Sequence, residues 1–159
     1  MPSPLAHLTA GYVVYEVYRH KRPEHDKVRF GPVPALLIMV VILSLLPDID
    51  SVVGVLTGDF GRFHNNLTHS LFVGFVVALV FGILASWKER SSFWPLLVVA
   101  LFCYELHVMM DALTVGRGVM ALWPFSSVRI LSPLPLFYGL HWSDGLRSWS
   151  HMVTLLTEA

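Results

Sequence analysis

Four apolar runs, separated by short polar segments, constrain the fold of this chain more than any other feature. They cover residues 4–18, 32–46, 71–87 and 93–110. Hydrophobic residues make up 55% of the 159-residue chain and charged residues only 14%, whereas a soluble domain usually carries about 25% charged residues. This composition predicts membrane-embedded helices, although the run 32–46 alone is short enough for a buried helix of a soluble protein.

The region beyond Thr114 has a different character. Glycines and prolines divide it into turns, and its aromatic residues are typical of a membrane interface: Trp123, Phe125, Phe137, Tyr138 and Trp142. Residues 144–157 then place apolar side chains at helical spacing. We therefore expect one all-α domain over residues 1–159. It would be a polytopic membrane helical bundle of about four membrane-embedded helices, followed by an irregular, aromatic-rich C-terminal region with a short amphipathic helix.

The basic residues predict how the chain crosses the membrane. Segments 19–29 and 88–92 hold seven of the eleven Lys and Arg residues, and such segments usually stay in the cytoplasm. We therefore expect a multi-pass protein of the inner (plasma) membrane, in contact with lipid. The net charge is zero and the basic residues form no extended stripe, which gives no support for nucleic acid as a partner.

Seven residues of metal-binding type lie at or near the ends of the apolar runs, although such residues are costly beside a membrane. They are His7, Asp48, Asp50, His64, His69, His107 and Asp111. If the basic segments lie in the cytoplasm and the four apolar runs cross the membrane in turn, all seven residues reach the non-cytoplasmic face. Because the threading made no use of the ligand types, this convergence supports a shared metal site.

Each piece of the set also has a simpler interpretation. His107 and Asp111 are four residues apart, so they share one helix face and could also form a packing hydrogen bond. Asp48 and Asp50 follow Pro47, which is expected to end the second helix, and could instead belong to a polar cap turn.

The histidine-rich segment His64–Ser70 is open to more than one interpretation too. His64 and His69 are five residues apart, so we expect a helix to begin between them. Both could alternatively be solvated or capping histidines. His7, taken singly on an apolar helix, is more often a buried core histidine than a ligand.

Other titratable residues are expected to stand outside the ligand set. His20 and His25 belong to the basic cytoplasmic segment and are expected to be solvated. His141 and His151 lie in the C-terminal region, where an acid, base or additional ligand role is open. Glu105 lies inside the fourth run and is expected to support a ligand histidine from the second shell, or to pair with an arginine.

The ordered motifs resemble a known family. They are His7-Leu8-Thr9-Ala10-Gly11, Leu46-Pro47-Asp48-Ile49-Asp50, His64 to Ser70, and His107 to Asp111 followed by Thr114 and Gly116. The set, over residues 5–126, is similar to that of the LexA-binding, inner-membrane-associated hydrolases (YdjM-like, membrane-bound metal-dependent hydrolases). This resemblance implies a small multi-span helical membrane protein with hydrolytic activity.

One position departs from the family pattern. Similar chains commonly carry Arg-Gly after the first histidine of the His-x-x-x-x-His element, whereas this chain has Asn65-Asn66. If that arginine orients an anionic substrate, its role is vacant here or passes to Arg62, Arg117 or Arg129.

The leading hypothesis is a metal-dependent hydrolase at the membrane–water interface. Catalytic zinc commonly uses three protein ligands and keeps one open position, so seven candidates suggest two divalent ions. Zn²⁺ is preferred, with Mn²⁺, Fe²⁺ or Co²⁺ as alternatives. Asp50 or His69 is the candidate general base. Paired metals suit a phosphoester or another ester of a lipid-like, amphipathic substrate, whose acyl part the aromatic segment 123–142 could hold.

Two further functions remain open from the sequence. The same ligands could form a non-catalytic site that stores, senses or structurally binds a metal ion. A transport path is disfavoured because the third run is wholly apolar and the ligands gather at one end. The basic segment 19–29 could also bind a soluble regulatory protein.

Overall fold

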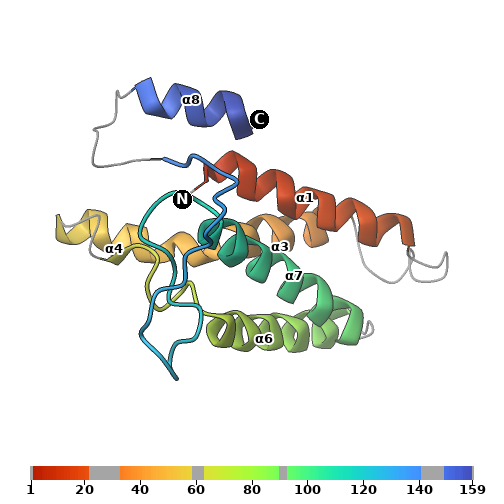
Figure 1. Cartoon of the computed structure of the whole chain (residues 1–159). Coiled ribbons are helices and arrows are strands. Elements are labelled where there is room, and N and C mark those ends of the chain that lie inside the picture. The colour runs from red at the N-terminus through yellow and green to blue at the C-terminus, as the bar shows by residue number, and fades with distance from the viewer. Residues whose placement is uncertain (1, 22–32, 59–62, 90–92, 141–148, 159) are drawn as a thin grey trace.

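The computed structural model describes residues 2–21, 33–58, 63–89, 93–140 and 149–158. Its elements are α1 (Pro4–Lys21), α3 (Val33–Leu45), the 3-10 turn η1 (Leu46–Asp48), α4 (Ile49–Thr57), α6 (Leu71–Glu89), α7 (Phe93–Ala112) and α8 (Trp149–Glu158). The described part contains two isolated β-bridges and no strand. The predicted all-α class is therefore confirmed, and Figure 1 shows how the helices gather around α7.

Helix α7 is the centre of the packing. It contacts α1, α3 and α6, and ten of its residues are buried. One apolar cluster joins α7 to α3 and α1 through side chains such as Leu43, Val40 and Tyr15. Because one face of α7 packs against these helices, His107 and Asp111 on that face lie inside the molecule and not on its surface.

The number of membrane spans differs from the prediction. Among the described helices, two segments are long and apolar enough to cross a membrane, Leu36–Thr57 and Phe93–Ala112. The third run, Leu71–Trp87, is a shorter apolar helix. The first helix ends with polar residues, among them Glu16 and Arg19, which lower its mean hydropathy. The expectation of about four spanning helices is therefore wrong by length and composition, and two remain.

The second helix, α3, ends at Leu45, just before Pro47, as predicted. Pro47 lies in the first turn of η1, where its missing N–H leaves no helical hydrogen bond unmade. The chain then continues directly into α4, which ends at Gly58 in the left-handed conformation, with φ of 72°. Asp48 and Asp50 therefore follow the end of α3, at a break within one continuous apolar segment.

The segment after α7 is irregular, as predicted, and it closes over the start of α6. The amide N–H of Leu71 donates to the carbonyl of Ala121, and the hydroxyl of Ser70 donates to the carbonyl of Trp123. The predicted C-terminal helix is present as α8, beside α1 in Figure 1. Its expected beginning, residues 144–148, lies outside the described residues, as do most of the basic segment 19–29, His25, Arg62 and His141.

Gly11 allows α1 to approach α3 closely. A Cβ atom at Gly11 would lie 2.0 Å from Ser44 Oγ, 3.0 Å from Ser44 Cβ and 3.3 Å from Val40 Cγ1. A glycine-to-alanine change inside a helix ordinarily stabilises it by about 0.5–1 kcal/mol. Here we expect the opposite sign, because overpacking a close contact costs about 1–3 kcal/mol.

The measurement is the thermal unfolding temperature of the detergent-purified protein. Gly11→Ala should lower it, whereas Thr9→Ala, on the exposed face of the same helix, should leave it nearly unchanged. An unfolding temperature of Gly11→Ala at or above that of the wild type would show that α1 and α3 are not in contact there.

Candidate metal centre

Five separate segments bring the seven predicted ligands together. His7 comes from α1, Asp48 from η1, Asp50 from α4, His64 and His69 from residues 63–70, and His107 and Asp111 from α7. They form two groups that share His69, and His7 lies beside them. The convergence expected from the sequence is thus present, and the binding of metal by these residues stays a prediction.

The first group consists of Asp48, His69, His107 and Asp111. Nε2 of His69 lies 3.0 Å from Oδ2 of Asp111 and 3.3 Å from Nε2 of His107. Oδ1 of Asp48 lies 3.5 Å from Nε2 of His107 and 3.7 Å from Nε2 of His69. Two ring nitrogens and two carboxylates therefore surround one small volume.

The contacts of Nδ1 in His69 and His107 indicate which tautomer each ring adopts. Nδ1 of His107 lies 2.7 Å from the carbonyl oxygen of Ser44, which can only accept, so Nδ1 carries the hydrogen. Nδ1 of His69 lies 3.2 Å from Oδ2 of Asp50, again an acceptor when ionised. Each neutral ring then presents an Nε2 lone pair to the first group, as a metal-binding histidine does.

His7 extends the first group on the α1 side. Its ring stacks on that of His107 with the centroids 3.7 Å apart, and its Nε2 lies 3.5 Å from Oδ1 of Asp111. The side chain is fully buried, and neither ring nitrogen has a hydrogen-bond partner within the described part of the chain. A buried imidazole without such a partner is costly, and a metal ion bound by Nε2 would give that nitrogen a partner.

The second group consists of Asp50, His64 and His69. Nδ1 of His64 lies 3.3 Å from Oδ1 of Asp50 and 2.6 Å from the hydroxyl of Ser51. Oδ2 of Asp50 also accepts from the amide of Asn66 at 3.2 Å and from the hydroxyl of Thr68 at 2.9 Å. Asp50 is therefore held from several sides and connects the two groups through His69.

The electrostatics of the first group fit a cation. Oδ1 of Asp48 and both oxygens of Asp111 are buried without a hydrogen-bond partner among the described residues. The ion pairs seen for these carboxylates in the described residues are all with histidines. Since buried carboxylates need a positive partner, a divalent ion suits this donor set.

The pKa of His69 also reflects the negative charge of the carboxylates around it. Burial disfavours the charged imidazole and lowers its pKa, but contacts with Asp111, Asp48 and Asp50 outweigh that effect. The result is a pKa held well above the usual range for histidine. In the metal-free protein a proton on His69 can thus balance part of the carboxylate charge that a metal ion would balance more fully.

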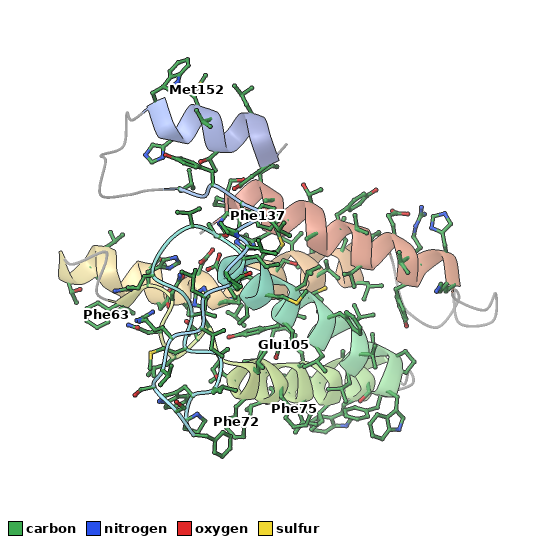
Figure 2. The ribbon with its side chains drawn as sticks, viewed as in Figure 1. Phe63, Phe72, Phe75, Glu105, Phe137 and Met152 are labelled. Carbon is green, nitrogen blue, oxygen red and sulfur yellow. The ribbon has the colours of Figure 1, made fainter. Side chains whose placement is uncertain are left out.

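Glu105 lies away from the ligand groups. It faces α6, because a Cβ atom at Gly74 would lie 2.2 Å from its Oε1, and Figure 2 shows Glu105 between α7 and α6. No hydrogen bond joins Glu105 to a predicted ligand within the described ranges. The expected role of Glu105 in supporting a ligand histidine therefore stays a prediction.

Among the remaining histidines and arginines considered in the sequence, the histidines lie away from the ligand groups and the arginines contact the ligand segment. The side chain of His20 is 71% exposed, which confirms its expected solvation, and His151 is on α8, away from α7 in Figure 1. Arg117 donates to the carbonyl of His64. Arg129 donates to the carbonyl of Asn65 and to the side chain of Asn66. Both arginines therefore hold the segment in which this chain departs from the family pattern.

Several residues that support the ligands were not predicted from the sequence. Ser44, whose carbonyl orients His107, lies inside an apolar run. Tyr104 donates its hydroxyl to the carbonyl of Thr68 at 2.6 Å and so ties α7 to the ligand segment. Asn65 adopts a left-handed backbone with φ of 59°, which asparagine tolerates better than most residues. A backbone carbonyl acceptor cannot be recognised from a sequence. The only available signal for Ser44 was that it is a polar residue within an apolar run.

Comparisons with known proteins agree with this architecture. The model of the YdjM inner membrane protein family matches residues 1–156. The chain is similar to the inner membrane protein YbcI of Escherichia coli (strain K12), with 37% identity over 108 residues. That match covers 63% of this chain and 60% of the relative, so the chain matches less than two thirds of the relative's length. No solved structure matches.

The family match covers nearly the whole chain, and two segments can cross a membrane. The relative is likewise named as an inner membrane protein. The location predicted from the basic and apolar segments is thereby confirmed. The chain belongs to the YdjM inner membrane protein family.

Proposed function

We propose that this chain is a metal-dependent hydrolase that cleaves a phosphoester, or another ester, of a lipid-like substrate in the inner membrane. The observation that carries the proposal is the first ligand group. The Nε2 atoms of His69 and His107 converge there with two carboxylates, three of whose oxygens are buried without a hydrogen-bond partner among the described residues. Such a set has no use in packing, because each of its members costs free energy when it is buried without a cation.

The chain's residues divide the work at this site. Asp48, His69, His107 and Asp111 would hold a divalent ion, with His7 next to them. The ion, when bound, supplies a water of lowered pKa and polarises the ester oxygen. Ser44 and Asp50 orient the two histidine rings, which fixes the direction of their lone pairs.

The predicted second ion would belong to the second group. Asp50, His64 and Nδ1 of His69 are its possible ligands. His69 would then give one ring nitrogen to each ion, which requires the loss of the Nδ1 hydrogen that now faces Asp50. We therefore propose that the first group binds metal more tightly than the second, with Zn²⁺ as the preferred ion and Mn²⁺, Fe²⁺ and Co²⁺ as alternatives.

A non-catalytic metal site is the second candidate function. The side chains of His69, His107 and Asp111 are at most 1% exposed, which also suits a structural ion that stays closed to substrate. Asp48, whose side chain is 16% exposed, is the most accessible member of the first group. Hydrolysis therefore requires that the substrate reach the first group either past Asp48 or through the second group. The proposed side of the membrane, the non-cytoplasmic face, rests on the basic segments alone.

The test is hydrolysis by detergent-purified protein loaded with Zn²⁺ or Mn²⁺. We expect phosphate release from dioleoyl phosphatidic acid, its loss on chelation, and its loss in His107→Ala. Glu16→Gln, a charge change at a partly exposed side chain of α1, serves as the control and should keep the activity. Metal that binds, raises thermal stability and gives no hydrolysis of this ester or of p-nitrophenyl phosphate would favour the structural site. Activity that survives in metal-free His107→Ala would rule out the proposed centre.

A further inference from the structure

An apolar pocket opens beside the second ligand group, between α4 and residues 63–68. Its volume is about 630 Å³, within the range of about 300–1,000 Å³ typical of small-molecule sites. Its apolar lining side chains are Ile49, Val53, Phe63, Leu67 and Met120. Figure 2 shows Phe63 next to α4. None of the aromatic residues of segment 123–140 lines this pocket, so the acyl site expected at residues 123–142 stays a separate prediction.

The polar lining of the pocket belongs to the metal site. Asp50, Asn66 and Thr68 supply it, and the last two both donate to Oδ2 of Asp50. The same carboxylate lies 3.2 Å from His69, which is shared by both ligand groups. A molecule in the pocket would therefore have its apolar part along α4 and a polar part at Asp50.

The position of α4 argues for a hydrocarbon occupant. Ile49 and Val53 belong to the segment Leu36–Thr57, which is apolar enough to cross a membrane, and the chain belongs to an inner membrane protein family. A polar, water-soluble molecule would leave most of its hydrogen-bonding groups unsatisfied against this lining. An acyl chain gains about 0.8 kcal/mol for each methylene group that it buries away from water.

We propose that this pocket holds one acyl chain of a membrane phospholipid, with the phosphate ester of that lipid placed at Asp50. The proposal rests on the proposed hydrolase function and specifies its substrate class. The apolar side chains of α4 and of residues 63–67 select for the acyl chain, and the ligand groups act on the phosphate ester of the glycerol to which that chain is attached.

The test is photo-crosslinking, which needs no hydrolysis. The probe is phosphatidic acid with a diazirine at the end of one acyl chain, added to the detergent-purified protein with and without Zn²⁺. We expect labelling at Val53, Leu67 or Met120. Excess unlabelled dioleoyl phosphatidic acid should suppress it, and glycerol 3-phosphate, which has no acyl chain, should not.

Two neighbouring valines provide a matched pair of variants. Val53 lines the pocket, whereas Val52 is on the same helix, is 55% exposed and does not line it. Val53→Trp should fill the pocket and lower labelling by about tenfold or more, since two lost methylene burials account for that factor. Val52→Trp should label like the wild type.

The outcomes separate this inference from the hydrolase proposal. Equal labelling of both variants, or labelling that unlabelled lipid does not reduce, would mean bulk lipid contact and would overturn the acyl pocket even if the enzyme is active. Loss of labelling in Val53→Trp alone supports the pocket, even when metal-loaded protein hydrolyses nothing. In that case the hydrolase proposal fails and the site is a lipid-binding one.

Discussion

Asp111→Asn is expected to lower the affinity of the protein for Zn²⁺ by more than about 100-fold, beyond the 10–100-fold typical of changes behind the ligands. Asp111 is fully buried, lies 3.0 Å from Nε2 of His69 and is 3.5 Å from Nε2 of His7. Asparagine keeps the shape of the side chain and removes its charge. The loss of affinity would therefore report on charge and ligation, and not on packing.

The measurement is the shift in unfolding temperature on adding Zn²⁺ to protein stripped of metal. Binding to the folded state stabilises it by about 2.7 kcal/mol at a metal concentration 100 times Kd, so the wild type should shift upward and Asp111→Asn much less. Glu16→Gln removes a carboxylate at an exposed ion pair and should shift like the wild type. An equal shift in all three proteins would show that Asp111 is not a ligand.

Asp50→Asn has the second largest expected effect. Oδ2 of Asp50 accepts from Asn66, Thr68 and Nδ1 of His69, so Asp50 positions His69 toward the first group. We expect the affinity for Zn²⁺ to fall by about 10–100-fold. Hydrolysis should return largely to the wild-type rate once Zn²⁺ is saturating.

The same variant separates positioning from a base role. A general base contributes about 10²–10⁴-fold to the rate, so a base at Asp50 would leave the rate low at any metal concentration. Glu16→Gln, at an ion pair on α1 with Arg19, is the control and should keep the wild-type affinity and rate. A rate in Asp50→Asn that stays 100-fold low at saturating metal would assign the base to Asp50 and contradict the positioning role.

The assembly of the ligands could be predicted from the sequence because it depends on helix ends. His107 and Asp111 share a helix face by their spacing alone. The basic segments then indicated that the ends of the runs near His7, Asp48 and His64 meet. In the structure His7 lies beside Asp111 and His64 beside Asp48, which spacing within any single run could not have shown.

Other features depend on details that a residue pattern does not carry. Pro47 was expected to end a helix, and α3 does end at Leu45. The residue pattern did not indicate that the chain continues through η1 into α4, which a proline in a first turn allows without the loss of a hydrogen bond. The number of spans was overestimated because four apolar runs differ in length and in terminal charge. The pocket was missed because its lining comes from α4, residues 63–68 and Met120, which become neighbours only in the folded chain.

Metal analysis of the detergent-purified protein tests the central claim most directly. The wild type should contain at least one equivalent of a divalent transition metal, and the two-ion form of the site should contain two. Asp48→Ala and His107→Ala should each lose the ion of the first group, while Glu16→Gln keeps it. Wild-type protein that remains metal-free after incubation with Zn²⁺, Mn²⁺, Fe²⁺ and Co²⁺, or variants that keep the full metal content, would contradict a metal centre at these residues.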